Sequence, residues 1–96
     1  MYVGIMRLEI RLHGAGSLKE KRSVVRSLLG RLRNRFSVSA AEVDCQDIWQ
    51  RAAIGVTMVA ADRNQIETEF RRIEEFIEMN GLAELGERQT DIFVFA

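Results

Sequence analysis

The residues best suited to chemistry in this sequence are the cations between Ser17 and Phe36, where seven basic residues stand against a single acid. On a helix, six of them fall on the two flanks of one apolar stripe, and we take these as candidate nucleic-acid-binding residues: Lys19, Arg22, Arg26, Arg31, Arg33 and Arg35. Arginine bonds phosphate oxygens bidentately, so such a helix suits a phosphate backbone. The alternative is that these side chains form ion pairs with acids of a second helix, among them Glu67, Glu74 and Glu78.

The outermost surface of this helix, between the two basic flanks, carries only small or neutral residues, namely Ser23, Ser27, Gly30 and Asn34. A glycine costs a helix interior about 1 kcal/mol relative to alanine. We therefore expect another molecule to approach this strip closely, either a phosphate backbone or another protein subunit.

The segment His13-Gly14-Ala15-Gly16-Ser17 precedes the helix and could offer free backbone amides to an anion. Acylphosphatases use a glycine-rich loop at this place, but their phosphate-holding arginine lies in a motif that these residues do not reproduce. We expect a tight turn, no catalytic residue and no enzymatic activity. A small acylphosphatase-like enzyme is the less favoured alternative.

A second polar cluster surrounds the one tryptophan, in the stretch from Glu42 to Arg51. Tryptophan brings a large rigid area and one polar handle to an interface. We expect Trp49, with Asp47 and Gln50, to contact a partner, and the alternative is that Trp49 packs beneath its own hairpin. One cysteine and one distant histidine do not make a zinc site, so we expect neither a metal nor another cofactor.

Hydrophobic periodicity predicts the elements that position these residues. A period of two indicates strands, and a capping box formed by Ser17 and Glu20 marks the start of the first helix. The predicted order is strand 2–12, helix 17–35, strand 37–44, strand 51–60, a helix between Asp62 and Gly81, and a strand that is clearest at 90–95, with 82–89 either a connection or an early part of that strand. This order is that of a ferredoxin-like α+β sandwich, a four-stranded antiparallel sheet with two helices on one face. Right-handed crossovers place the first and third strands at the centre.

Apolar residues also fall on the sheet face that points away from the helices, namely Val3, Ile5, Phe93 and Phe95. Apolar area on an open sheet face usually means contact with another copy of the chain. We therefore expect at least a homodimer.

Length and composition set the remaining bounds. Ninety-six residues, 47% of them apolar and 29% charged, allow one domain spanning 1–96. The net charge is zero, but the chain is polarised by segment, since six acids outnumber three arginines between Asp62 and Met79. No apolar run is long enough to cross a membrane and the first residues are no signal peptide, so we expect a cytoplasmic protein with no membrane partner.

Two stretches, Ser17 to Arg22 and Glu42 to Arg51, closely resemble the signatures of the YlxP-like family of small bacterial proteins, a domain of unknown function. The resemblance implies a ferredoxin-like fold and a gene found beside genes for translation and ribosome maturation. It brings no catalytic residues. In the family the position of Cys45 is more often histidine or an aromatic residue, so no chemical role is carried over to this cysteine.

We therefore expect a non-enzymatic accessory protein that associates with RNA or the ribosome through its basic first helix. The alternative is a protein–protein interaction module that forms a homo-oligomer through the open sheet face and the Trp49 hairpin.

Overall fold

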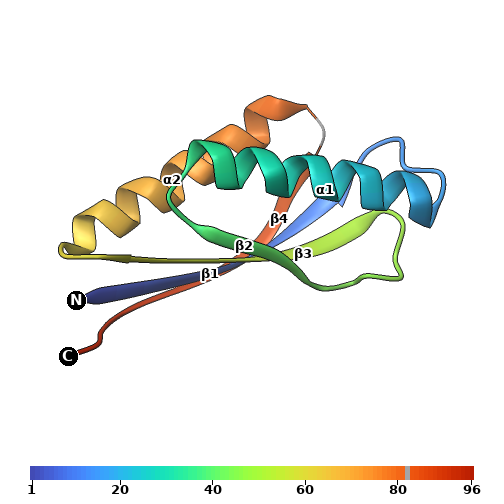
Figure 1. The fold of residues 1–96 in the computed structure, drawn as a ribbon. Helices are drawn as coiled ribbons and strands as arrows, with labels where there is room; N and C mark the ends of the chain where they lie inside the picture. The colour runs from blue at the N-terminus through green and yellow to red at the C-terminus, as the bar shows by residue number, and fades with distance from the viewer. Residues whose placement is uncertain (82) are drawn as a thin grey trace.

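A computed structural model describes residues 1–81 and 83–96 of the chain, with the six elements in the predicted order (Figure 1). The elements are β1 (Tyr2–Leu12), α1 (Leu18–Arg35), β2 (Ser39–Asp44), β3 (Arg51–Ala60), α2 (Arg63–Asn80) and β4 (Ala83–Val94). The strands form one antiparallel sheet in the order β2-β3-β1-β4, with both helices on the same face. The ferredoxin-like fold is confirmed, with the first and third strands at its centre.

The last strand is longer than its clearest sequence signal, because it begins at Ala83 and not near Thr90. Most of its residues between Glu84 and Asp91 are exposed, so they show no alternation of apolar and polar side chains. The strand is held there by its backbone pairing with β1, which shifts register once, between Leu8 and Ile10 of β1. Leu82, in the segment for which two interpretations were open, lies outside the described residues.

Both helices begin where their capping residues predict, and α2 also ends at its predicted capping glycine. The Ser17 hydroxyl accepts a hydrogen bond from the Glu20 amide at 3.1 Å, and the Glu20 carboxylate accepts one from the Gly16 amide at 2.7 Å. Asp62 caps α2, and Gly81 ends it in the left-handed conformation at φ 78°. Neither helix of the described residues combines the length and apolarity that a membrane span needs.

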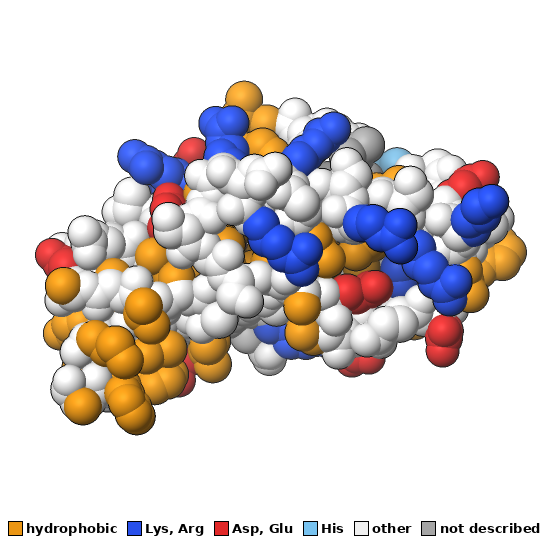
Figure 2. Space-filling model, viewed as in Figure 1, with side chains coloured by type: hydrophobic (Ala, Val, Ile, Leu, Met, Phe, Trp, Pro, Cys, Tyr) orange, Lys and Arg blue, Asp and Glu red, His pale blue; other side chains and the backbone are white. Residues whose placement is uncertain are grey.

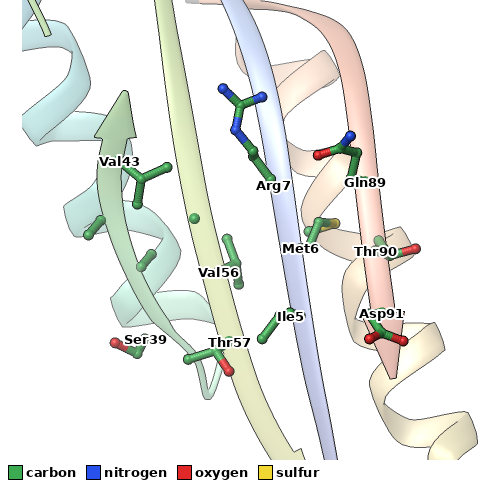
Figure 3. A pocket seen from close by; sticks show the side chains of 13 residues that line it. Ile5, Met6, Arg7, Ser39, Val43, Val56, Thr57, Gln89, Thr90 and Asp91 are labelled. Atoms are coloured by element: carbon green, nitrogen blue, oxygen red, sulfur yellow. The ribbon is translucent and has the colours of Figure 1, made fainter. Parts of the chain in front are cut away.

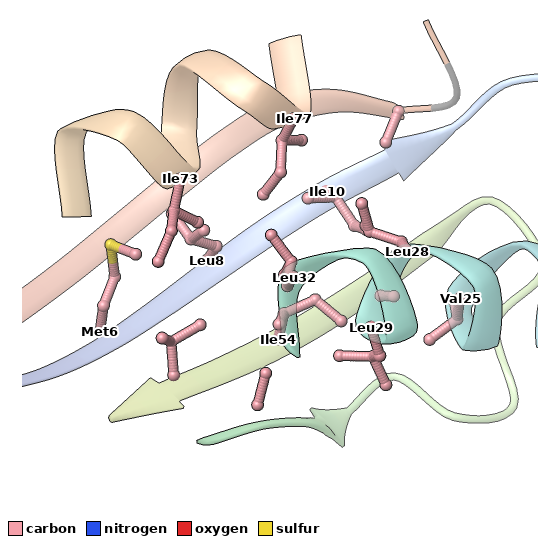
Figure 4. Packing of buried hydrophobic residues seen from close by; sticks show 14 of the residues in the cluster. Met6, Leu8, Ile10, Val25, Leu28, Leu29, Leu32, Ile54, Ile73 and Ile77 are labelled. Carbon is pink, nitrogen blue, oxygen red and sulfur yellow. The ribbon is translucent and has the colours of Figure 1, made fainter. Parts of the chain in front are cut away.

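The core lies between the helices and one face of the sheet (Figure 4). Its largest fully buried apolar side chains come from both central strands and both helices, namely Leu8, Ile10, Leu28, Leu32, Ile54, Ile66, Ile73 and Ile77. At Gly4 the helix α2 comes so close to β1 that a Cβ atom would clash with Ile66. This close contact fixes α2 over β1, while α1 packs on the β2 side of the sheet.

Candidate polyanion-binding surface

Three exposed cations, Lys19, Arg22 and Arg26, form a row on α1. Their spacing of i, i+3 and i+7 places them above one another on one side of the helix. None of the three has a carboxylate of the described residues within 4.0 Å of its charged nitrogens. We call these three residues the basic row, and Figure 2 shows Lys and Arg side chains following one another along α1.

The other three predicted cations of α1 are exposed but held by neutral groups of the chain. Arg31 donates to the Asn80 side-chain oxygen at 3.0 Å, and Arg33 donates to the carbonyl of Ala40. The guanidinium of Arg35 lies 5.1 Å from the centre of the Phe76 ring, a cation–π contact. These contacts fix the side chains in place, and no carboxylate of the described residues lies within 4.0 Å of the three guanidinium groups.

Two of the three acids proposed as alternative partners of α1 pair with other cations in the structure. Glu67 accepts from Arg63 within α2 at 3.0 Å, and the largely buried Glu74 pairs with Arg88 of β4. The hydrogen bond to Glu74 raises the pKa of Arg88 above its ordinary value. Glu78 forms no ion pair with the described part of α1.

Lys21, a seventh cation of α1, has a different environment, which the sequence prediction missed. Its side chain is fully buried, its ammonium nitrogen lies 3.0 Å from Oε2 of Glu42, and it donates a hydrogen bond to the carbonyl of Cys45. The sequence contains a signal for this burial, because Lys21 stands in the apolar stripe with Val25 and Leu28 at i, i+4 and i+7. The contact joins the two stretches that carry the family resemblance.

The hairpin between β2 and β3 is therefore fixed to the first turns of α1. Cys45 adopts a left-handed φ of 63°, and its carbonyl also accepts from the Ile48 amide at 3.1 Å. Trp49 is 45% exposed, and Asp47 and Gln50 are exposed as well. Within residues 1–81 and 83–96 no group of three His, Cys, Asp or Glu side chains could hold a metal ion.

The loop before α1 offers fewer free amides than its glycines suggest. The amides of Gly16 and Glu20 already donate to side chains of the capping box. His13 is exposed and lies 3.4 Å from the Glu84 carboxylate. His13 and Gly14 form a bend in which Gly14 adopts a left-handed φ of 77°.

The open face of the sheet contains a shallow apolar groove of about 460 Å³ (Figure 3). Ile5 and Thr57 lie on its floor, and Val43 of β2 leans over Gly55, where a Cβ atom would lie only 2.8 Å from the valine Cγ1. The small residue at position 55 is thus explained by a neighbour within the chain. Of the apolar residues predicted for this face, Val3 pairs directly with Phe93 across β1 and β4, and Phe95 follows the end of β4.

Comparison with known proteins gives the same family as the two sequence stretches. Residues 3–90 match the family model described as protein of unknown function, DUF503. The chain is also similar to the uncharacterized protein YlxP of Bacillus subtilis (strain 168), with 42% identity over 76 residues that cover 79% of this chain and 83% of that protein. The match includes α1, the β2–β3 hairpin and most of β4.

Proposed function

The chain belongs to the DUF503 family, whose function is unknown, and we propose that it binds RNA through the basic row on α1. The observation that carries the proposal is the set of three exposed cations on one side of a helix, with no carboxylate of the described residues within 4.0 Å. The protein would act as a cytoplasmic, non-enzymatic accessory factor for structured RNA, such as that of the ribosome.

The dimensions of the basic row suit successive phosphates. Lys19 and Arg26 are seven residues apart, which corresponds to about 10 Å along a helix. Each of the three cations can neutralise one phosphate, so the row provides up to three phosphate contacts. The row therefore matches a backbone and does not read base edges.

The helix surface beside the row allows close approach. Ser23 and Ser27 are exposed, and a Cβ atom added at Gly30 would meet no atom within 4 Å. The packing of the chain itself therefore gives no reason for a glycine at this position. A strand of phosphates lying against the helix would supply the reason, and the two hydroxyls could donate to it.

The proposal is tested by the salt dependence of RNA binding, measured by fluorescence anisotropy with a labelled RNA hairpin. Three phosphate contacts predict a slope of log K against log salt of about −3 for a duplex and about −2 for a single strand. Affinity should therefore fall about 15- to 60-fold between 50 and 200 mM salt. The double variant Arg22→Glu, Arg26→Glu should bind far more weakly and show a slope of about −1, because Lys19 alone is left of the basic row.

The matched control is Arg71→Glu with Arg72→Glu, which makes the same charge change at two exposed positions of α2. This variant should retain most of the affinity, because it leaves the basic row intact. If both double variants lose the same amount of affinity for RNA, the loss reflects the net charge of the protein and not the basic row. Unchanged binding after the reversal on α1, with an unchanged circular dichroism spectrum, would refute the proposal.

A second candidate function is assembly of copies of this chain, and it is favoured by the apolar side chains that the fold leaves exposed. Ile5 is 46% exposed in the middle of the open sheet face, and Phe93 and Trp49 are exposed as well. Light scattering on the wild type and on Ile5→Asp and Trp49→Ala variants tests whether this face and the hairpin form the contact. A chain that stays monomeric at high concentration would exclude assembly.

A further inference from the structure

The strand β4 forms an open edge of the sheet, and its structure differs from that of the other edge. The strand order leaves β2 and β4 each with one unpaired side. β2 is short and its pairing is irregular between Glu42 and Asp44. By contrast, β4 pairs with β1 without interruption from Arg88 to Val94, so its other side is a long, regular edge.

The hydrogen bonds show which backbone groups point outward from this edge. Phe95 and Met1 exchange backbone hydrogen bonds, with N–O distances of 2.8 Å and 3.3 Å, so Phe95 faces β1. Because this direction alternates along an antiparallel strand, the amides and carbonyls of Thr90, Ile92 and Val94 point away from β1. An independent contact agrees, since the carbonyl of Ile92 accepts from the Arg63 side chain at 3.2 Å.

The side chains along this edge provide little protection against pairing. Natural edge strands are usually protected by lysine, proline, a bulge or a covering element. From Thr90 to Phe95 the chain has one charge, Asp91, and neither lysine nor proline. Val94 and Phe95 are 64% and 59% exposed. Among the described residues, the side chain that hydrogen-bonds an outward backbone group of this stretch is Arg63.

We propose that two copies of this chain pair antiparallel along β4, with Ile92 facing Ile92 of the second copy. In this register every outward amide and carbonyl from Thr90 to Val94 meets a partner. Asp91 lies opposite Phe93 of the second copy, and Thr90 lies opposite Val94. A register centred on Asp91 would oppose two carboxylates, which is unfavourable for a directly facing pair. The edge can thus complete its own backbone hydrogen bonds, pair Ile92 with Ile92, and keep the two Asp91 carboxylates apart.

Pairing displaces one existing contact, the hydrogen bond from Arg63 to Ile92. Arg63 keeps its ion pair with Glu67 at 3.0 Å, so its charge retains a partner. The lost bond is exposed, and exposed hydrogen bonds contribute little net stability because water replaces them. Arg63 therefore gives the edge only weak protection against pairing with another strand.

The dimer leaves the basic row accessible. Antiparallel edge pairing about a twofold axis places the helices of both copies on the same face of one continuous sheet. α2 packs over β4, whereas α1 packs over β2 at the opposite edge. The two basic rows would thus lie outermost on one face, and the proposed dimer does not depend on RNA binding.

The experiment compares Val94→Pro with Val94→Thr by size-exclusion chromatography with light scattering. Proline removes the outward amide of Val94 without removing a hydrogen bond to β1, whereas threonine keeps the amide and the β propensity. The wild type and Val94→Thr should show twice the 11.0 kDa chain mass, and Val94→Pro should show the mass of one chain. Arg63→Ala should tighten the dimer, because the competing donor is gone.

Amide hydrogen exchange by NMR gives a readout at the edge itself. In a monomer only the amides that face β1, such as those of Asp91 and Phe93, are protected, and in the dimer those of Ile92 and Val94 are protected too. If Val94→Pro unfolds the chain, Thr90→Pro makes the same test at another outward amide. A monomeric wild type would overturn the proposal. So would a dimer that survives both proline variants or that separates only on Ile5→Asp, since that dimer would use the sheet face.

Discussion

The contact between Lys21 and Glu42 allows a quantitative prediction. Lys21 is fully buried, and the Glu42 side chain is only 17% exposed. Removing one partner of a buried ion pair typically costs about 3–5 kcal/mol, because the remaining charge stays buried without compensation. A domain of this length has a free energy of unfolding of about 5–14 kcal/mol. The substitution Lys21→Met, which keeps the apolar stem of the side chain, should therefore remove roughly a fifth or more of the stability.

The assay is urea unfolding followed by the fluorescence of Trp49, which lies in the hairpin that Lys21 contacts. With a dependence on urea of about 1.5 kcal/mol per molar, the midpoint should fall by about 2–3 M. The control is Lys19→Met, an exposed lysine two residues away on the same helix. It should change the free energy of unfolding by less than about 0.5 kcal/mol.

A double-mutant cycle with Glu42→Gln separates the ion pair from packing. The two single variants should each be strongly destabilised, and the double variant should lose less than the sum of the two, with a coupling energy of about 1–3 kcal/mol. Strictly additive losses would mean that the two charges do not stabilise one another. A loss below about 1 kcal/mol for Lys21→Met would show that the ammonium is not buried in solution, and the reasoning about this contact would be wrong.

Two further predictions concern close contacts at glycines. Gly4→Ala should destabilise the chain by about 1–3 kcal/mol through overpacking, because a methyl group there would clash with Ile66 and lie 3.0 Å from Phe70. An unchanged melting temperature would contradict the packing of α2 on β1. Gly55→Ala should lower the free energy of unfolding by about 1 kcal/mol in the wild type, because Val43 Cγ1 lies 2.8 Å from the new methyl carbon. In a Val43→Ala background the loss should be much smaller. An equal loss in both backgrounds would show that Val43 is not the obstacle.

The elements that the sequence predicted best are those with one buried side. Residues of β1 and both helices alternate between core and solvent with the period of their element, so hydrophobicity alone locates them. The first half of β4 lacks this signal. Of its residues only Ala83 is buried, and the strand forms because β1 offers a row of backbone partners. When a strand is held only by backbone pairing with a distant strand and both of its faces are exposed, its sequence does not alternate between apolar and polar residues.

The candidate site was only partly predictable, because exposure depends on partners far along the chain. The six cations on the flanks of α1 are exposed as the helical pattern suggests, but Asn80, Ala40 and Phe76 hold three of them. Lys21 was missed because lysine is rarely buried without a partner, and its partner Glu42 lies on β2. The position of Lys21 in the apolar stripe of α1 turns its side chain toward the core. The carboxylate of Glu42, which stabilises the buried ammonium, is brought there only by the fold.

A chain with no net charge can present a positive surface because its acids are engaged or distant. Glu20, the one acid of α1, accepts from the Gly16 amide and caps the helix. Glu42, on the strand that α1 packs against, pairs with the buried Lys21. These two carboxylates thus each have a structural partner, and none of the described residues places a carboxylate within 4.0 Å of the charged nitrogens of the basic row. It follows that Lys21→Met should weaken RNA binding indirectly, because the negative charge of Glu42 beside α1 is then no longer neutralised. The double variant Lys21→Met, Glu42→Gln should restore the affinity for RNA.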